Sequence, residues 1–235
     1  MTKAILASTS TLHNQDYLEY LIPHIKELYK NAEEVLFIPY ARPGGISLDE
    51  YTAKANEAFA KAGLKLKGIH EFRDPAKAVE NAEGIFTGGG NTFLLVSELY
   101  RNKIMNLIKT VVLDGTPYMG TSAGTNITGL TMQTTNDMPI IYPPSFKTIG
   151  LVPFNINPHY LDPDPNSEHK GETRETRIKE FHGLNSQPVI GLREGSWIEL
   201  VGNKITLKGN LPARLFEKDK LPYEIESGTD LTDLN

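Results

Sequence analysis

The sequence contains no cysteine among its 235 residues, so a disulfide framework, a thiolate metal site and a cysteine nucleophile are all excluded. It also lacks any run of basic residues of the kind that neutralises nucleic-acid phosphates, and its formal net charge is −5. We therefore expect no nucleic-acid partner.

Long apolar segments are missing as well. No stretch approaches the ~20 apolar residues that a bilayer-spanning helix needs. The apolar run at 4–7 stops at the polar residues Ser8, Thr9 and Ser10, so it is too short for the core of a signal peptide and is typical of a first strand. We expect a cytoplasmic protein without a membrane partner.

Apolar residues make up 39% of the chain, which is enough for a sizeable core, and no linker-like stretch divides it. Short apolar runs alternate with segments of helical periodicity. This alternation predicts a single α/β domain, residues 1–235, with a mostly parallel sheet covered by helices on both faces. The expected strands are 4–7, 35–39, 64–69, 84–87 and 117–120, and the expected helices are 17–29, 48–62, a short one from Pro75, 93–100 and 104–113.

The C-terminal part has a different pattern. The pair Gly202-Asn203 is typical of a hairpin turn. We expect antiparallel strands here that extend the edge of the parallel sheet. The expected elements are a polar helix over 171–182 and strands at 189–192, 197–201, 205–207 and 213–216.

The segment Gly120-Thr121-Ser122-Ala123-Gly124 follows the fifth expected strand and matches the Gly-x-Ser-x-Gly nucleophile elbow. A sharp strand-to-helix turn leaves no room for side chains beside the serine. It exposes the hydroxyl next to the free N–H groups and partial positive charge of a helix N-terminus. The pattern favours Ser122 as a nucleophile; the alternative is a glycine-rich turn in which Ser122 only caps the helix.

A serine hydroxyl needs a base to take its proton, and three histidines follow Ser122: His159, His169 and His182. His159 comes directly after Pro158, which restricts the backbone in a way that suits a side chain held in a loop. The other two lie in a charged stretch and at the end of the polar helix, as surface histidines do. We therefore take His159 as the candidate base.

The third member of a triad is an acid that fixes the imidazole tautomer and stabilises its cation. Glu194 follows the strand expected at 189–192 and has glycines on both sides, Gly191 and Gly195. A carboxylate at such a strand end fits the role. A turn glutamate paired with Arg193 explains the pattern equally well.

The segment Gly88-Gly89-Gly90-Asn91-Thr92 joins the fourth expected strand to a helix. It has neither the spacing of a dinucleotide fingerprint nor a P-loop lysine, so nucleotide binding is weakly supported. A backbone N–H of this loop and that of Ala123 are candidate donors to an oxyanion. The alternative is a tight turn in which Asn91 caps the helix.

Taken together, these segments resemble peptidase E, the α-aspartyl dipeptidase family, whose relatives include cyanophycinases. The resemblance covers nearly the whole chain, beginning with Ser8-Thr9-Ser10-Thr11-Leu12 and Tyr51-Thr52-Ala53-Lys54. It is strongest in six segments that keep the family's order: Gly88-Gly89-Gly90-Asn91-Thr92-Phe93, Ser122-Ala123-Gly124, Thr134-Thr135-Asn136-Asp137-Met138-Pro139, Ile156-Asn157-Pro158-His159, His169-Lys170-Gly171-Glu172-Thr173-Arg174-Glu175, and Gly191-Leu192 with Glu194-Gly195.

The resemblance implies a three-layer α/β/α fold related to class I glutamine amidotransferases, with serine as the nucleophile. It implies Ser122 as nucleophile, His159 as general base and acid, and Glu194 as the orienting group. In α/β-hydrolases, by contrast, the acid precedes the histidine. The resemblance also assigns the two oxyanion donors to the backbone of Gly90 and Ala123.

The family prefers an N-terminal aspartate, whose carboxylate needs a cation. Arg174 matches the family's arginine and can hold a carboxylate with two parallel hydrogen bonds. Asp137 is the candidate partner of the substrate ammonium, and Asn91 can hydrogen-bond either group. Without the resemblance, Arg174 is more simply a solvated helix charge and Asp137 a turn residue.

Two residues depart from the family pattern. Thr121 stands where the family often has a bulkier residue, and Arg193 stands where it often has proline. Both flank candidate catalytic residues, so the departures bear on the substrate range and not on the type of reaction.

These features predict a serine exopeptidase, a dipeptidase that hydrolyses Asp-Xaa dipeptides through an acyl-enzyme. We expect it to need no metal or cofactor and to work as a monomer or homodimer. One alternative is a cyanophycinase-like hydrolase of β-aspartyl dipeptides. Others are an α/β-hydrolase-type esterase, which would pair Asp164 with His182, and a non-enzymatic nucleotide-binding module.

Overall fold

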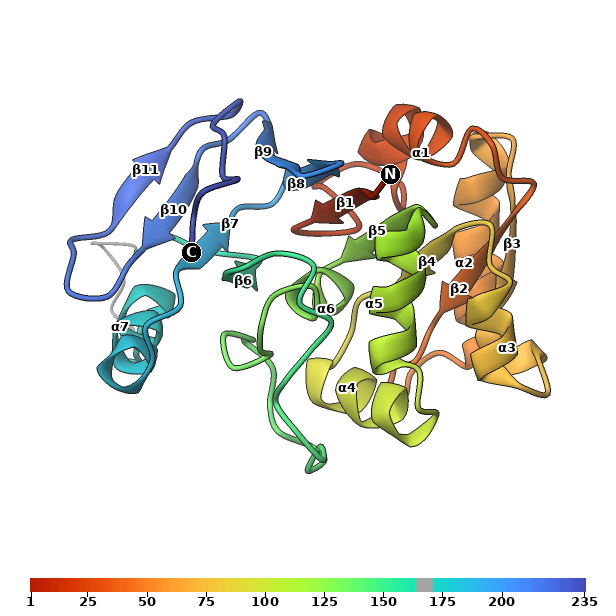
Figure 1. Ribbon diagram of the computed structural model, residues 1–235, viewed down its shortest axis with the longest axis horizontal. Helices are drawn as coiled ribbons and strands as arrows, with labels where there is room; N and C mark the ends of the chain where they lie inside the picture. The colour runs from red at the N-terminus through yellow and green to blue at the C-terminus, as the bar shows by residue number, and fades with distance from the viewer. Residues whose placement is uncertain (164–170) are drawn as a thin grey trace.

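The computed structural model describes residues 1–163 and 171–235, and a seven-stranded sheet forms its centre (Figure 1). Its strands are β1 (Lys3–Ala7), β2 (Glu34–Ile38), β3 (Lys65–Gly68), β4 (Ile85–Thr87), β5 (Tyr118–Thr121), β8 (Ser196–Val201) and β9 (Lys204–Gly209). Their order in space is β3-β2-β4-β5-β1-β8-β9. The strands from β3 to β1 pair in parallel, whereas β8 and β9 continue the sheet beyond β1 in antiparallel pairing.

Helices cover both faces of this sheet. Successive residues of a strand point to opposite faces, so Leu6 lies in one hydrophobic core and Ile5 in the other. The core around Leu6 contains α3, α4 and α5, and the core around Ile5 contains α1 and α2. The predicted three-layer α/β/α fold with a mostly parallel sheet is confirmed. The helices are α1 (Ile22–Leu28), α2 (Leu48–Lys61), α3 (Pro75–Glu80), α4 (Thr92–Arg101) and α5 (Met105–Asp114).

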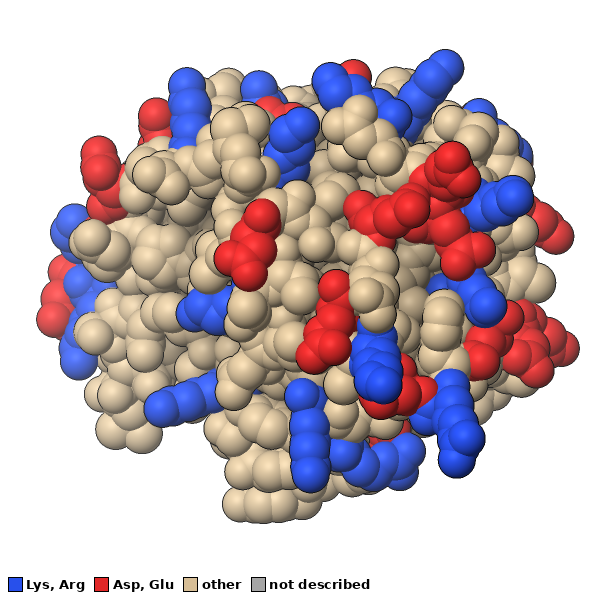
Figure 2. All heavy atoms as spheres, turned by 45° about the vertical axis from the view of Figure 1, so that its right-hand side comes forward, with Lys and Arg blue, Asp and Glu red and all other residues tan. Residues whose placement is uncertain are grey.

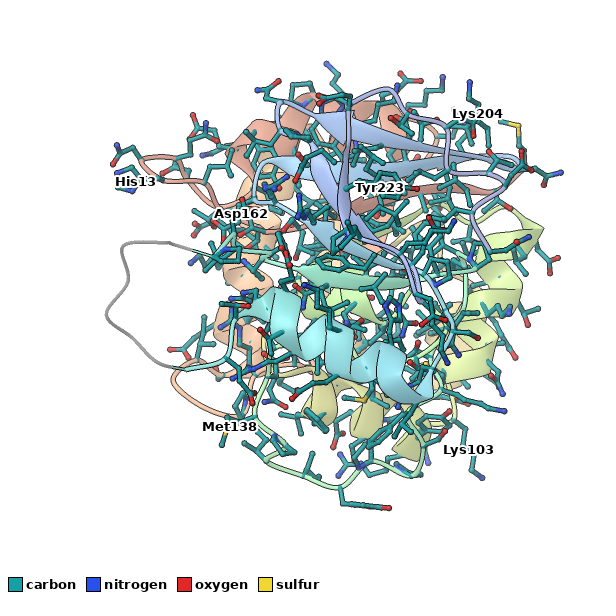
Figure 3. The ribbon with its side chains drawn as sticks, turned by 90° about the vertical axis from the view of Figure 1, so that its left-hand side faces the viewer. His13, Lys103, Met138, Asp162, Lys204 and Tyr223 are labelled. Atoms are coloured by element: carbon teal, nitrogen blue, oxygen red, sulfur yellow. The ribbon has the colours of Figure 1, made fainter. Side chains whose placement is uncertain are left out.

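A second, four-stranded sheet lies beside the first. Helix α7 (Arg174–Leu184) runs along this sheet (Figure 3) and packs Ile178 against Val189 and Phe216. The strands of this sheet are β6 (Asn155–Pro158), β7 (Val189–Leu192), β10 (Ala213–Phe216) and β11 (Tyr223–Ile225), in the order β11-β10-β7-β6.

The prediction that all C-terminal strands extend the parallel sheet is wrong for two of them. β8 and β9 do extend it, and the hairpin turn between them is confirmed, with Gly202 at a φ of 62°. β7 and β10 instead belong to the second sheet, because β6 gives β7 a parallel partner. The sequence does not indicate β6, since two of its residues are asparagines and its last is Pro158.

The helix boundaries differ modestly from the expected ones. The helix expected over 17–29 is a short 3₁₀ turn, Glu19–Leu21, followed by α1, in whose first turn Pro23 is tolerated. The polar helix begins at Arg174 because the Thr173 hydroxyl caps it, accepting a hydrogen bond from the Thr176 N–H at 3.1 Å.

The surface carries charges of both signs. On the face shown in Figure 2, acidic and basic side chains are interspersed. Within the ranges 1–163 and 171–235, no helix is long and apolar enough to cross a membrane.

Candidate active site

Ser122 lies at the sharp turn between β5 and the short helix α6 (Ala123–Asn126), with φ 54° and ψ −112°. A residue with a side chain rarely adopts this conformation. A Cβ at Gly120 would lie 2.3 Å from the Gly124 carbonyl oxygen, and a Cβ at Gly124 would lie 2.2 Å from that of Thr87. Only glycine fits at these two positions, as the elbow motif requires. The Ser122 side chain makes no capping hydrogen bond, so the helix-cap alternative is wrong.

The structure brings His159 to Ser122. Its Nε2 lies 2.8 Å from the Ser122 Oγ. His159 follows β6, and Asn126 of α6 donates a hydrogen bond to the Ile156 carbonyl of β6 at 2.8 Å. This contact fixes the strand that carries the imidazole against the helix that follows the elbow.

Glu194 completes a hydrogen-bonded row. Its Oε1 lies 2.6 Å from the Nδ1 of His159. Since a carboxylate accepts, Nδ1 carries the proton and Nε2 faces the Ser122 hydroxyl as an acceptor. β6 and β7 are parallel neighbours, with Pro158 opposite Leu192, so the residues just beyond the two strand ends meet.

Arg193 does not pair with Glu194. Its guanidinium binds Asp162 and Glu224, so the alternative of a turn glutamate held by its neighbour is wrong. The other departure from the family pattern, Thr121, is fully buried at the end of β5, opposite Ala7 of β1.

The glycine triplet lies against the elbow. A Cβ at Gly89 would come within 2.9 Å of the Ser122 Cβ. Gly90 has a φ of 144°, and a Cβ there would lie 2.2 Å from the Ala41 carbonyl oxygen. Ala123 is the first residue of α6, so its N–H has no acceptor within its own helix. The backbone at Gly89 and the first N–H of α6 thus both lie close to Ser122.

Asp137 and Asn91 lie together at the N-terminus of α4. One oxygen of Asp137, Oδ2, accepts hydrogen bonds from the N–H and hydroxyl of Thr92, at 2.7 and 2.6 Å. The Thr135 hydroxyl lies 3.0 Å from the same oxygen. Asn91 caps α4 by accepting from the Leu94 N–H at 3.1 Å and donates to the Met138 carbonyl at 2.8 Å. Both side chains thus have structural partners, as the simpler interpretation expected.

Arg174 is half-buried in the first turn of α7, and its buried Nη1 has no hydrogen-bond partner among the described residues. Burial, and next the guanidinium of Arg177, lower the pKa of Arg174. Glu194 and Asp137 act in the opposite direction on this pKa. Arg174 is therefore within electrostatic range of both the row of three residues and the α4 terminus, and it is not a fully solvated helix charge.

The other histidines do not join the row. His182 is buried, and its Nε2 lies 3.0 Å from the Gln187 carbonyl oxygen. His169 and Asp164 lie outside the described residues, so the esterase pair of Asp164 with His182 is not described. In the part of the chain with described coordinates, no group of three or more acidic or histidine side chains is placed to hold a metal.

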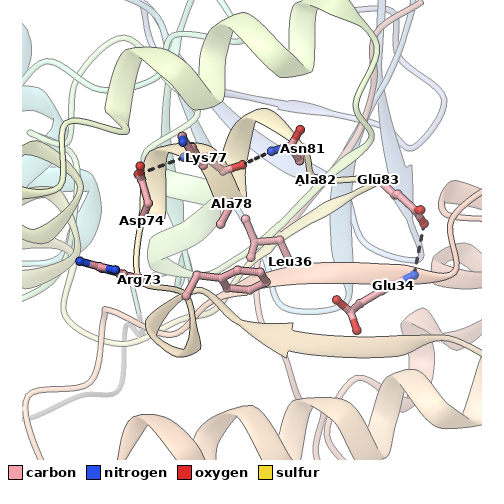
Figure 4. Close-up of a pocket in the computed structure, with 10 residues that line it drawn as sticks. Glu34, Leu36, Arg73, Asp74, Lys77, Ala78, Asn81, Ala82 and Glu83 are labelled. Carbon is pink, nitrogen blue, oxygen red and sulfur yellow. Dashed lines mark hydrogen bonds between the residues drawn. The ribbon is translucent and has the colours of Figure 1, made fainter.

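A hollow of about 330 Å³ lies beside α3 and the start of β2, and it contains none of the candidate site residues (Figure 4). Three of its polar side chains are engaged locally. Asp74 caps α3, Asn81 donates to the Lys77 carbonyl, and Glu83 accepts from the Glu34 N–H.

Sequence reasoning missed three residues of this region. Ser8 contacts the His159 backbone, and Thr92 and Thr135 bind Asp137. The signals for Ser8 were the polar stop after the first apolar run and the start of the family resemblance there, and neither gave it a role. Thr92 lies 45 residues from Asp137 in the chain, so no local sequence pattern shows that the two are in contact. Thr135 lies near Asp137 in sequence, but its hydrogen bond to that carboxylate was likewise not indicated.

Comparisons with known proteins agree with this geometry. The family model described as Peptidase family S51 matches residues 4–208. The chain is 47% identical over 230 residues to Peptidase E of Streptomyces coelicolor, covering 98% of this chain and 93% of that protein. It is 46% identical over 231 residues to a Drosophila melanogaster protein named "Probable alpha-aspartyl dipeptidase", covering 97% and 95%. The crystal structure of a peptidase from an acI-B1 Actinobacterium superposes with a TM-score of 0.68 at 16% identity, covering 98% and 96%.

The fold is class I glutamine amidotransferase-like, and together with the family match it defines a serine-type peptidase. The chain belongs to peptidase family S51. The predictions of an enzyme and of the peptidase E family are thereby confirmed. The names of the relatives support a serine dipeptidase and favour neither the cyanophycinase-like nor the esterase alternative. The roles of the individual site residues stay predictions.

Proposed function

We propose that this chain is a serine exopeptidase that hydrolyses dipeptides with an N-terminal aspartate, with Ser122 as its nucleophile. The observation that carries the proposal is the hydrogen-bonded row from Ser122 Oγ through His159 to Glu194, with lengths of 2.8 and 2.6 Å. This arrangement gives a serine hydroxyl the base it needs and gives the base a fixed tautomer.

In the first half-reaction, His159 Nε2 takes the hydroxyl proton while Ser122 Oγ attacks the aspartyl carbonyl carbon. The imidazolium then gives that proton to the leaving amine as the C–N bond breaks, which leaves an aspartyl ester on Ser122. Water attacks the ester with His159 again as base, and aspartate is released. Glu194 accepts the Nδ1–H and stabilises the imidazolium in both steps.

The negative charge on the carbonyl oxygen needs donors that are already in place. Gly90 and Ala123 supply these in the proposal, through their backbone N–H groups: Gly90 follows Gly89, which lies against Ser122, and Ala123 begins α6. Backbone donors held by a turn and a helix start need no reorganisation when the charge develops. At Gly90 the loop also has no room for a side chain, since a Cβ there would collide with the Ala41 carbonyl.

Arg174 is the proposed anchor of the substrate's side-chain carboxylate. Its Nη1 is buried without a partner among the described residues, and a buried guanidinium of this kind is satisfied by a carboxylate that it can bind with two hydrogen bonds. An aspartate side chain supplies that carboxylate.

Asp137 and Asn91 would hold the substrate ammonium. The three donors at Asp137 converge on Oδ2, which leaves Oδ1 for an ammonium. The Asn91 Oδ1 accepts from the Leu94 N–H, and an amide oxygen has a second lone pair, so it can also accept from the ammonium. A requirement for a free ammonium restricts cleavage to the first peptide bond.

We also propose that residues 1–235 act as one catalytic domain in the cytoplasm, as a monomer or homodimer, with no metal or cofactor in the reaction.

A dipeptide panel tests the function. It should contain Asp-Leu, Asn-Leu, Glu-Leu, Ala-Leu, N-acetylated Asp-Leu and the β-aspartyl isomer of Asp-Leu, with amine release as the readout. We expect Asp-Leu to have the highest kcat/KM and the acetylated peptide to be inert. Preference for the β-aspartyl isomer, or equal rates on Ala-Leu, would contradict the proposal.

A further inference from the structure

Arg193 stands immediately before the candidate triad acid, yet all five of its N–H groups are used elsewhere. Nε and Nη2 donate to the two oxygens of Asp162 at 2.8 and 2.6 Å. Nη1 and Nη2 donate to those of Glu224 at 2.7 and 3.0 Å. Nη1 also donates to the Pro212 carbonyl at 2.8 Å. A guanidinium has five N–H donors, so none remains for Glu194.

These bonds join segments that are distant in sequence. Asp162, labelled in Figure 3, lies three residues after His159, the residue that directly follows β6. Glu224 lies in β11. The guanidinium also lies 5.6 Å from the ring centroid of Tyr160, and the Arg193 side chain is only 14% exposed. Bidentate pairing on both sides fixes a guanidinium that is itself largely buried better than a single exposed ion pair does.

Glu194 itself has little else to hold it. Its side chain is 47% exposed, and His159 is its one hydrogen-bond partner among the described residues. It lies in a tight turn in which the Ser196 N–H donates to the Arg193 carbonyl at 3.1 Å and Gly195 has a φ of 92°. The direction of the carboxylate thus depends on how firmly the turn between β7 and β8 is anchored.

We propose that Arg193 is a positioning residue for the reaction: its bonds to Asp162 and Glu224 fix the turn so that the Glu194 carboxylate meets Nδ1 of His159. The same bonds occupy the one cation adjacent to Glu194 in sequence, so this cation does not draw the carboxylate from the imidazole. The inference rests on the proposed function, since it assigns to Arg193 the task of orienting the proposed triad.

A double-mutant cycle tests it, with Asp-Leu as substrate. Arg193→Gln should lower kcat by about 10²-fold, the scale expected from a small misplacement of a catalytic group, with little change in KM. Glu194→Gln should lower kcat at least as much. In the double variant, Arg193→Gln should add nothing further, because the group that it positions is already impaired.

Arg214→Gln is the matched control. Arg214 binds the same Glu224 carboxylate, at 3.0 Å, but it does not belong to the turn that carries Glu194. We expect the Arg214→Gln variant to keep the wild-type kcat, even if its thermal midpoint is lowered as much as that of Arg193→Gln. An equal loss of kcat in Arg214→Gln would overturn the inference, because loosening of the ion-pair cluster in general would then explain the result.

The inference would also be overturned if the fold-losses in kcat of the two single variants multiplied in the double variant. A wild-type kcat in Arg193→Gln would overturn it as well. If Arg193→Gln fails to fold, Arg193→Lys keeps the charge but loses the planar fork. A lower kcat for Arg193→Lys at an unchanged thermal midpoint supports the inference, and an unchanged kcat overturns it. A wild-type kcat in Glu194→Gln would instead contradict the proposed triad itself, whatever Arg193 does.

Discussion

The backbone N–H of His159 donates a hydrogen bond to the hydroxyl of Ser8, at 2.8 Å. The Ser8 hydroxyl in turn donates to the Leu192 carbonyl at 2.7 Å. Ser8 follows β1 and is fully buried, so it ties the first strand's end to both segments that carry the candidate base and acid. His159 has a φ of 54°, an uncommon backbone conformation that a fixed partner helps to maintain.

Ser8→Ala should therefore lower both stability and turnover. It leaves the His159 N–H and the Leu192 carbonyl without this partner, and a buried polar group without its hydrogen bond costs about 1–3 kcal/mol. We expect a lower free energy of unfolding and a kcat that falls more than KM rises. Ser10→Ala, two residues along, is the control and should do neither. Wild-type kcat in a folded Ser8→Ala protein would show that this contact does not position His159.

Arg174→Met should reduce kcat/KM for Asp-Leu by about 10²–10³. The substrate carboxylate loses its buried partner, which typically costs about 2–5 kcal/mol, and each ~1.4 kcal/mol is tenfold. Activity on Asn-Leu should fall much less. Arg177→Met removes a guanidinium one turn further along α7, from an exposed position with a loose 3.9 Å contact to Glu172, and should leave the preference intact.

The measurement for Arg174 is the ratio of kcat/KM for Asp-Leu to that for Asn-Leu, together with acylation by a small uncharged serine reagent. Acylation should be unchanged in Arg174→Met because the nucleophile and its base are untouched. Full preference for aspartate in Arg174→Met would contradict the assignment. An equal loss of acylation would mean that Arg174 holds the site together.

The Arg193 ion pairs should make stability depend on pH. Hydrogen bonds from Arg193 are the largest cause lowering the pKa of both Asp162 and Glu224 in the folded protein. Their stabilising contribution is therefore fully present above the unfolded-state pKa values, about 3.9 and 4.3, and is lost as pH falls through the lower folded values. The thermal midpoint of Arg193→Gln should lie furthest below wild type near neutral pH, and the gap should narrow below about pH 4.

Thermal unfolding followed from pH 7 to about pH 3 measures this gap. Arg101→Gln breaks an ion pair with Glu98 in which the arginine is largely exposed, and such pairs contribute little. It is the control, with a small difference from wild type at every pH. A gap for Arg193→Gln that stays constant across this range would contradict the ion-pair account.

The elbow could be predicted from the sequence because its constraints are local. Gly120 and Gly124 flank Ser122 in the chain, and the structure shows that a Cβ at either would collide with backbone. The first five strands and their helices followed in the same way from alternating patterns along the chain.

The meeting of His159 with Glu194 has a different origin. It depends on the parallel pairing of β6 with β7, and β6 is a strand of polar residues and proline that shows no strand pattern. The residues themselves suggested His159 and Glu194 as candidates, and the resemblance to a family assigned both roles. No spacing rule, however, places residues 35 apart within 2.6 Å. The contact of Ser8 with His159, 151 residues away, was missed for the same reason, since only the packed sheets bring these segments together.

The most direct test of the central claim is intact-mass analysis and peptide mapping after reaction with a sulfonyl fluoride. The account predicts one adduct per chain, on Ser122, formed in step with the loss of Asp-Leu hydrolysis. It predicts no adduct in Ser122→Ala, and much slower labelling in His159→Ala because the base is missing. Full hydrolysis by Ser122→Ala, or loss of activity through an adduct on another residue with Ser122 unmodified, would contradict it.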